Sequence, residues 1–181
     1  KPSLPLAHFA PDYTCYICSL SKSICSGLRI AYLTFPTRFA ADIRRGIYNI
    51  NVKTPSLNSE TAGELIYSAT AKKIIGQKRM EAAARSEICK DFFPEIAKNP
   101  LGFSLWLPLP ERFHETDFEH LAQKRGISVC HSHRFLVGEA DAQQYLRIAL
   151  SSPDTKEELT KGLSILRDLL ASDMDENFFC I

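Results

Sequence analysis

Several side chains suited to binding a phosphate group lie in the stretch from Ser19 to Arg29. Ser19 and Ser21 carry hydroxyls, Lys22 follows directly, and Arg29 comes seven positions after the lysine. Hydroxyls donate hydrogen bonds to phosphate oxygens, and a guanidinium binds such oxygens bidentately. A lysine amine beside that phosphate could form a Schiff base with an aldehyde cofactor. The same spacing also fits a polar turn with two solvated cations, so spacing alone leaves both interpretations open.

Two apolar segments flank this stretch and would position it. Residues 13–18 are rich in aromatic and apolar side chains with little polar alternation, which predicts a strand buried on both faces. Residues 28–35 predict a second strand, which Pro36 ends. Because only a short connection joins them, we expect an antiparallel pair with the lysine in its connecting loop.

The segment that begins Ser-Leu-Ser-Lys-Ser-Ile-Cys-Ser-Gly-Leu-Arg resembles the lysine motif of fold-type I pyridoxal-phosphate (PLP) enzymes. It is similar to the form Ser-x-Ser-Lys-x-x-x-Pro-Gly-x-Arg-x-Gly-Tyr of class I/II aminotransferases, which also occurs in the effector domains of MocR-type (GntR-family) transcriptional regulators. The resemblance continues to about Ala171. Ser26 stands where the family usually has Pro, and Ala31 where it usually has Gly. Both are small, so we expect an altered loop rather than a lost site.

The resemblance implies an α/β fold, the C-terminal portion of the PLP-dependent transferase fold. Residues 1–76 would be the end of the PLP-binding large domain, with two strands of its sheet. Residues 77–172 would be the α+β small domain, and residues 173–181 an acidic tail. Helical spacing predicts a helix from Ser59 that Gly76 interrupts and that resumes over residues 77–93. A short amphipathic helix is expected at 37–46 and a loop at 49–58.

In the second part, apolar alternation predicts strands at residues 102–109 and 144–151 and a short strand at 127–130. The lone Trp106 in the first of these is expected to be structural. A helix over 116–124 should end at Gly126. Ser152-Pro153-Asp154 is expected to open the last helix, whose buried stripe would be Leu159, Leu163, Leu166 and Leu170.

Arg147 is a candidate anion ligand because it lies within an apolar strand. Tyr145, Arg147 and Ala149 should share one face of that strand, and the leucines and isoleucine the other. An arginine there needs an anionic partner, which is either a structural carboxylate or a substrate carboxylate gripped bidentately. The segment resembles the Arg-Leu-x-x-Ser strand that holds the substrate α-carboxylate in the aminotransferase family, which favours the second role.

Two segments contain cysteines or histidines at spacings that could bind a metal, but metal binding is disfavoured at both. Cys15 and Cys18 form a Cys-x-x-Cys, but they are expected on opposite faces of a strand and no second such pair follows. All six cysteines are expected to be reduced, buried thiols of a cytoplasmic protein. His131-Ser132-His133 follows Cys130 without a nearby carboxylate, and we expect an ordinary loop. In relatives this loop borders the substrate pocket, which leaves the substrate preference open.

Composition excludes some functions for this segment. A net charge of +1, from 22 basic and 21 acidic residues, gives no general attraction to nucleic acid or anionic membranes. No apolar run is long enough to span a bilayer. The chain opens in Lys-Pro-Ser-Leu-Pro rather than at a Met, so we expect a piece of a longer protein.

The resemblance implies that Lys22 is the Schiff-base lysine and the general base of transamination. It implies that the cofactor phosphate is held by Ser19, Ser21 and Arg29. Arg147 would orient the substrate. The phosphate loop, stacking aromatic and pyridine-binding Asp of such sites precede the lysine motif in the family. We therefore expect the isolated chain to be inactive.

Two classes of parent protein, both homodimers in the family, remain open. One is a MocR-type regulator that senses an amino acid or amine and binds DNA through an N-terminal winged-helix domain. The other is a metabolic aminotransferase. The Lys-to-Arg spacing and the opening Leu-Pro-Leu-Ala-His-Phe-Ala-Pro-Asp favour the regulator. An unrelated α/β domain without PLP chemistry is the third interpretation.

Overall fold

The computed structural model describes residues 4–96, 102–113, 115–139 and 143–172. The chain forms two compact units, Lys1–Lys78 and Arg79–Ile181. Each unit has its own apolar core. The acidic tail proposed for residues 173–181, together with Cys180 and His114, lies outside the described residues. The assignment of the units to a large and a small domain stays a prediction.

The first unit consists of short helices around one β-hairpin. Its elements are α1 (Leu6–Phe9), η1 (Pro11–Tyr13), β1 (Tyr16–Ser19), α2 (Leu20–Ser23), η2 (Ser26–Leu28), β2 (Ala31–Thr34), η3 (Thr37–Phe39), α3 (Ala40–Asn51), α4 (Ser56–Tyr67) and the start of α5 (Thr70–Phe92). β1 and β2 pair antiparallel, with Ser19 opposite Ala31 and Tyr16 opposite Thr34. The predicted antiparallel pair is therefore confirmed, although both strands are shorter than expected.

The prediction that the first strand is buried on both faces is wrong for this chain. All four residues of β1 are exposed, including Ile17 at 66%. Within the residues that the structure describes, the two strands form a sheet by themselves, and no third strand pairs with either edge. A two-stranded ribbon cannot bury both of its faces, because burial requires further layers on each side.

The core of the first unit gathers residues from the hairpin end and from two helices. Leu20, Ile24 and Ile30 pack with Ala62 of α4 and Ala71 of α5. The side chain of Asn58 on α4 donates a hydrogen bond of 2.9 Å to the Leu28 carbonyl oxygen. These contacts attach the hairpin end to the helices that follow it.

The helices differ from the predicted pattern in where they break. α3 continues to Asn51 and α4 begins at Ser56, so only a short link remains of the loop predicted at 49–58. Gly76 does not interrupt a helix, because α5 runs through it from Thr70 to Phe92. The break falls instead at Ala69, whose φ of 60° is incompatible with a right-handed helix. An interior glycine costs only about 1 kcal/mol relative to alanine, which a long helix tolerates.

The second unit is built on a three-stranded antiparallel sheet in the order β3-β5-β4. Its strands are β3 (Ser104–Leu109), β4 (Cys130–His131) and β5 (Gln144–Ala149), and its helices are the remainder of α5, α6 (Glu115–Lys124), η4 (Ser132–Phe135) and α7 (Lys156–Ala171). Trp106 lies opposite Arg147 on β5, and Arg147 in turn lies opposite Cys130 on β4. The strands predicted at 102–109 and 144–151 are confirmed with slightly shorter bounds.

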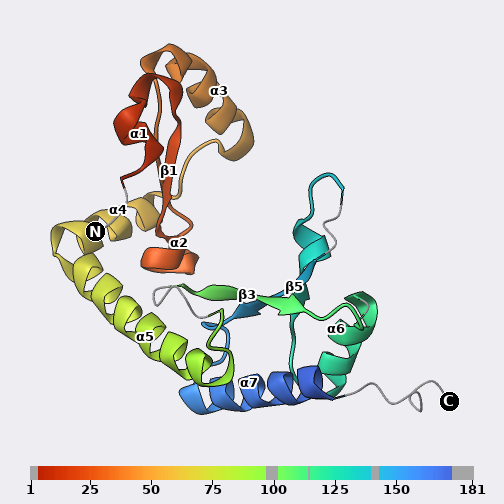
Figure 1. Cartoon of the computed structure of the whole chain (residues 1–181). Helices are drawn as coiled ribbons and strands as arrows, with labels where there is room; N and C mark the ends of the chain where they lie inside the picture. Colours follow the sequence, from red (N-terminus) through yellow and green to blue (C-terminus); the bar gives the residue numbers. More distant parts are fainter. Residues whose placement is uncertain (1–3, 97–101, 114, 140–142, 173–181) are drawn as a thin grey trace. The chain divides into compact units, whose positions relative to one another are not determined.

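One face of this sheet forms the core of the second unit. In Figure 1, α7 (blue) runs along the sheet that β3 and β5 form, and its leucines pack against the sheet's apolar face. The buried apolar side chains of the strands and of α7 are Leu105, Leu107, Leu109, Leu146, Ile148, Leu159, Leu163, Leu166 and Leu169. The predicted stripe on the last helix is thus correct except that Leu169 is buried and Leu170 only partly so. The opposite face of the sheet carries Trp106, Tyr145 and Arg147.

The ends of the helices follow local capping rules, with one correction. Thr155, rather than Ser152, caps α7: its hydroxyl accepts from the Glu158 backbone N–H at 3.1 Å, and the Glu158 carboxylate accepts from the Thr155 N–H at 3.4 Å. This reciprocal pair is a capping box, in which the backbone N–H groups of Thr155 and Glu158 both find acceptors. Gly126 ends α6 with φ +81°, as predicted. Among the described residues, no helix is long and apolar enough to cross a membrane.

Candidate functional site

The lysine motif is a helical turn rather than the open loop that the sequence predicted. Ser19 ends β1, and its hydroxyl accepts a hydrogen bond of 3.2 Å from the Ser21 N–H at the start of α2. Leu20 and Ile24, four positions apart, are both buried. Because residues at this spacing share one face of a helical turn, their burial leaves Lys22 exposed between them.

The backbone brings the motif's two cationic residues to one end of the hairpin. The Leu20 N–H donates to the Ile30 carbonyl oxygen at 3.0 Å, which extends the pairing of the strands beyond Ser19. Arg29 directly precedes this closure and adopts a left-handed conformation with φ 53° and ψ 33°. A non-glycine residue pays about 1 kcal/mol for that conformation. The strained backbone turns the chain at the point where β2 begins, and the Arg29 side chain is exposed.

The charges at the hairpin end suit an anion. Within the part of the chain that the structure describes, the side chains of Lys22 and Arg29 make neither a hydrogen bond nor an ion pair. Lys78, from α5 in the same unit, donates a hydrogen bond of 3.3 Å to the Lys22 carbonyl oxygen and adds a third cation. The sequence from Tyr16 to Thr34 contains no acidic residue. A phosphate group therefore fits the donors present, which are hydroxyls, ammonium groups and a guanidinium. Sequence reasoning missed Lys78, because no local pattern links residues 56 positions apart.

Arg147 lies on the open face of the second unit's sheet among aromatic rings. It is half-buried, and its guanidinium carbon is 5.8 Å from the centre of the Phe135 ring. Among the described residues no carboxylate pairs with it, so the structural carboxylate that was one of its two expected partners is not found there. Trp106, its neighbour across the strand pair, is 46% exposed, and the structural role expected for it stays a prediction.

The histidines after Cys130 form a hydrogen-bonded network, where the sequence analysis expected ordinary loop residues. His131 is buried, and its Nε2 lies 3.1 Å from the Gln144 side-chain oxygen. An amide oxygen only accepts, so Nε2 carries the proton and Nδ1 is left to accept the His133 backbone N–H at 3.1 Å. The rings of His131 and His133 also meet through their Nδ1 atoms at 3.0 Å. In the described ranges, no group of three or more His, Cys, Asp or Glu side chains could hold a metal ion.

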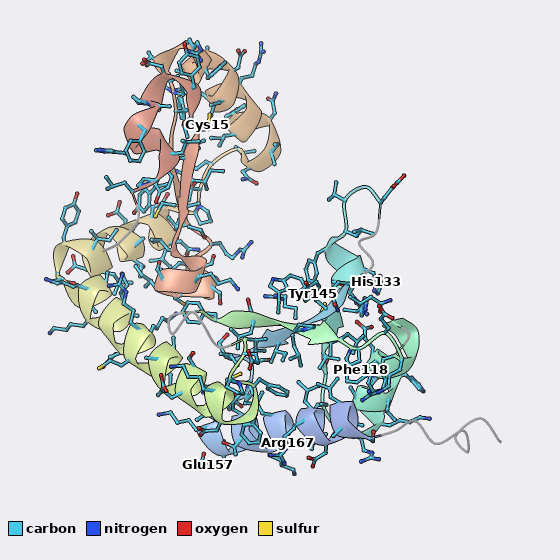
Figure 2. The ribbon with its side chains drawn as sticks, viewed as in Figure 1. Cys15, Phe118, His133, Tyr145, Glu157 and Arg167 are labelled. Carbon is cyan, nitrogen blue, oxygen red and sulfur yellow. The ribbon has the colours of Figure 1, made fainter. Side chains whose placement is uncertain are left out.

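Glu119 of α6 anchors the same loop. One carboxylate oxygen accepts the His131 backbone N–H at 2.8 Å, and the other accepts from the Arg134 guanidinium at 2.8 Å. Burial alone would raise the pKa of this carboxyl, but the hydrogen bonds from Arg134 and from the His131 backbone outweigh it and hold the pKa below its ordinary value. The same ion pair raises the pKa of Arg134. Figure 2 shows His133 and Tyr145 together at this end of the sheet.

The cysteines correct the expectation of buried thiols. Cys15, Cys18 and Cys25 are exposed in this chain, whereas Cys89 of α5 is buried. Burial raises the pKa of the Cys89 thiol to about 11. The exposure of the first three follows from the uncovered faces of the hairpin.

A cavity of about 630 Å³ lies beside β5 in the second unit, lined by residues 125–130, by the end of β5 and by the first turns of α7. Arg147 is its one residue in common with the predicted site. β4 pairs with β5 only at Arg147 and Leu146, so in the described residues β4 does not extend along the end of β5 beyond Arg147. The cavity lies beside this end of β5, between the strand and α7.

Comparisons with known proteins place the chain among aminotransferases by fold. No family model matches it. It is 34% identical over 173 residues to an uncharacterized HTH-type transcriptional regulator of Bacillus subtilis, YdeF, covering 94% of this chain and 37% of the relative. It is 24% identical over 166 residues to an uncharacterized aminotransferase of Saccharolobus solfataricus, covering 88% of this chain and 41% of that protein.

The solved structures that the chain resembles are aminotransferases. A multiple substrate aminotransferase from Thermococcus profundus matches with a TM-score of 0.79 and 20% identity, over 94% of this chain and 44% of that one. LysN, an α-aminoadipate aminotransferase from Thermus thermophilus, matches with a TM-score of 0.77 and 20% identity, over 94% and 46%. A PLP-dependent aminotransferase from Streptococcus suis matches with a TM-score of 0.67 and 18% identity, over 86% and 41%. The chain has the fold of the C-terminal part of PLP-dependent aminotransferases. It spans about two fifths of the length of the relatives it matches.

Within this aminotransferase fold, Arg85 is a structural residue that the sequence analysis missed. Its side chain is buried and donates to the carbonyl oxygens of Leu150, Pro153 and Asp154 at 2.9, 2.7 and 3.2 Å. It also pairs with Glu81 at 2.8 Å. Arg85 thereby holds the connection from β5 to α7 against α5. The Glu81–Arg85 spacing of four residues was the one signal that could have drawn attention to it.

Proposed function

We propose that this chain is the PLP-binding, aminotransferase-like domain of a MocR-type regulator of the GntR family. The observation that carries the proposal is the pair of exposed cations, Lys22 and Arg29, at one end of the β1–β2 hairpin. Neither side chain has a partner among the described residues. The chain that carries them has the fold of PLP-dependent aminotransferases. A phosphate-bearing aldehyde would satisfy both.

Each residue of the motif has a distinct role in this proposal. Arg29 binds the cofactor phosphate bidentately, and the hydroxyls of Ser19 and Ser21 donate to it. Ser19 can do so while capping α2, because a hydroxyl that accepts a hydrogen bond keeps its own proton to donate. Lys22 would hold the cofactor through its aldehyde group, and the bound cofactor would supply an electron sink for chemistry at an amino acid's Cα. The Lys22 amine would serve as the base that moves the Cα proton.

Arg147 is proposed to bind the carboxylate of an amino-acid effector, because it is a half-buried cation without an acidic partner in the described residues. The whole protein is proposed to be a cytoplasmic homodimer that binds DNA through a winged-helix domain preceding this segment. The segment itself is nearly neutral and is not proposed to touch DNA.

The relatives favour a regulator over a metabolic aminotransferase. The chain is 34% identical to the regulator from Bacillus subtilis, and this match covers 94% of the chain. It is 24% identical to the aminotransferase from Saccharolobus solfataricus, and that match covers 88% of the chain. A metabolic aminotransferase remains the second candidate, since both share the fold.

One experiment separates the two candidates. The protein that carries this chain is loaded with PLP, and binding to DNA from its own promoter region is measured beside turnover of amino acid with 2-oxoglutarate. We expect DNA binding that changes when an amino acid or amine is added, and no sustained turnover. Multiple turnovers without DNA binding would replace the regulator with the metabolic enzyme.

A further inference from the structure

Three aromatic side chains lie with Arg147 on the open face of the second unit's sheet. Trp106 and Phe135 meet edge to face with ring centres 5.5 Å apart and planes at 88°. Trp106 and Tyr145 meet similarly, at 6.4 Å and 85°. We call Trp106, Phe135 and Tyr145 the aromatic cluster. It comes from three separate elements, β3, η4 and β5, and all of it lies on the face opposite the leucine core.

The cluster contacts the guanidinium but leaves its hydrogen-bonding edge available. Phe135 lies 5.8 Å from the guanidinium carbon of Arg147. An arginine that stacks its planar face on an aromatic ring can still direct its N–H groups at a carboxylate. Within the described residues, those N–H groups have no acceptor. A ligand carboxylate bound there would lie beside the rings.

The rings are held in place by the chain before any ligand binds. The Ser132 hydroxyl in η4 accepts the Tyr145 backbone N–H at 3.1 Å. The His133 N–H donates to the buried His131 ring, and Arg134 is paired with Glu119. These three attachments come directly before Phe135 in the chain and hold the turn that carries it. A preorganised aromatic surface loses little conformational entropy on binding, which favours it as a recognition element.

The exposure of the cluster leaves apolar area that a ligand bound at Arg147 could cover. Phe135 is 49% exposed and Trp106 46% exposed, although they pack on each other. A ligand with a small or acidic side chain would leave these rings in water. A ligand with an aromatic ring would bury apolar area on both partners and add edge-to-face contacts.

We propose that the ligand held by Arg147 is a carboxylate with an aromatic side chain, selected by Phe135 and Trp106. This inference rests on the proposed function in taking Arg147 as the carboxylate ligand. It goes further in naming the ligand class and the residues that select it.

The test compares two carboxylates that lack an amine, so that neither can react with PLP. Binding of 3-phenylpropionate and of propionate is measured by calorimetry on the protein that carries this chain, with and without PLP. We expect 3-phenylpropionate to bind about tenfold to a hundredfold more tightly, the gain expected for burying one phenyl ring. Phe135→Ala should remove most of that ratio, and Arg147→Gln should weaken both ligands.

Val137→Ala is the matched control, since Val137 lies in the same connection, is 95% exposed and makes no ring contact in the described structure. It should leave the ratio unchanged. Equal binding of the two carboxylates, no detectable binding of either, or a ratio that Phe135→Ala leaves intact would overturn the inference. Loading of PLP on Lys22 is scored separately. PLP bound with no ring preference refutes this inference alone, and ring preference without PLP refutes the proposed function alone.

Discussion

At the scale of single residues, the proposal depends most on Arg29. Its left-handed backbone fixes where the guanidinium leaves the chain, and its side chain has no competing partner among the described residues. A phosphate ligand would therefore gain a bidentate, charge-assisted contact there that no neighbouring group could replace.

Arg29→Gln should weaken PLP binding by about tenfold to a hundredfold, since a lost charged hydrogen bond costs about 1.5–3 kcal/mol. The PLP affinity of Arg29→Lys should lie between that of the wild type and that of Arg29→Gln, because lysine keeps the charge and loses the bidentate geometry. Arg44→Gln, an exposed arginine of α3, is the control and should bind PLP normally. The measurement is a spectroscopic titration with PLP. Equal affinity in Arg29→Gln and Arg44→Gln would remove Arg29 from the site.

A second residue-scale prediction concerns Cys89, whose pKa is raised from 9.0 to about 11 by burial. The thiol should resist alkylation in the folded protein at neutral pH. Because the unfolded chain ionises first, the stability that the protonated thiol contributes is complete below pH 9 and is lost as the pH rises toward about 11.

The check is chemical unfolding at a series of pH values, with Cys89→Ala as the reference. The wild type should lose more stability than Cys89→Ala over that interval. Parallel pH curves for the two proteins would show that the buried thiol does not titrate as described.

At the scale of elements, Arg85 connects α5 with the turn between β5 and α7. Its guanidinium N–H groups donate hydrogen bonds to three backbone carbonyl oxygens in the turn between β5 and α7. These oxygens accept no hydrogen bond from a helix or from a neighbouring strand in the described residues. Arg85→Ala should lower the free energy of unfolding by about 2–4 kcal/mol, because it removes several charged hydrogen bonds from a buried position. Arg79→Ala, an exposed change on the same helix, should cost little. Denaturant unfolding measures both, and similar losses in the two variants would contradict this role of Arg85.

Sequence periodicity predicted the elements whose burial is completed within this chain. The alternation in β5 correctly placed Arg147 and Tyr145 on one face, and leucine spacing correctly placed the core stripe of α7. The same reasoning failed at β1, because an apolar strand signals burial by layers that the described chain does not contain. It also failed at Gly76, where the helical context outweighs a local preference.

The candidate site divides in the same way. Lys22, Ser19, Ser21 and Arg29 are close in sequence, so their types and spacing could be recognised directly. Lys78 and Phe135 could not be, because each reaches its neighbours only through the tertiary fold. Arg147 is intermediate, since an arginine within an apolar strand signals an unmet need for an anion without naming which one.

At the scale of the whole molecule, this chain spans about two fifths of the aminotransferases it matches. The 181-residue chain by itself should therefore show no sustained transamination, since Lys22 and Arg147 would act without the rest of such a site. Turnover is measured on the isolated chain with PLP, amino acid and 2-oxoglutarate, against a Lys22→Ala chain as blank. Steady turnover above that blank would show that the described residues make a complete active site.

The proposed function requires that Lys22 holds PLP, and borohydride reduction followed by peptide mapping tests this most directly. The protein that carries this chain is incubated with PLP, reduced, digested and analysed by mass spectrometry, with Lys22→Ala and Lys72→Ala in parallel. We predict a phosphopyridoxyl group on Lys22 in the wild type and in Lys72→Ala, and none on this segment in Lys22→Ala. Label spread over exposed lysines, or an unlabelled Lys22, would contradict the claim.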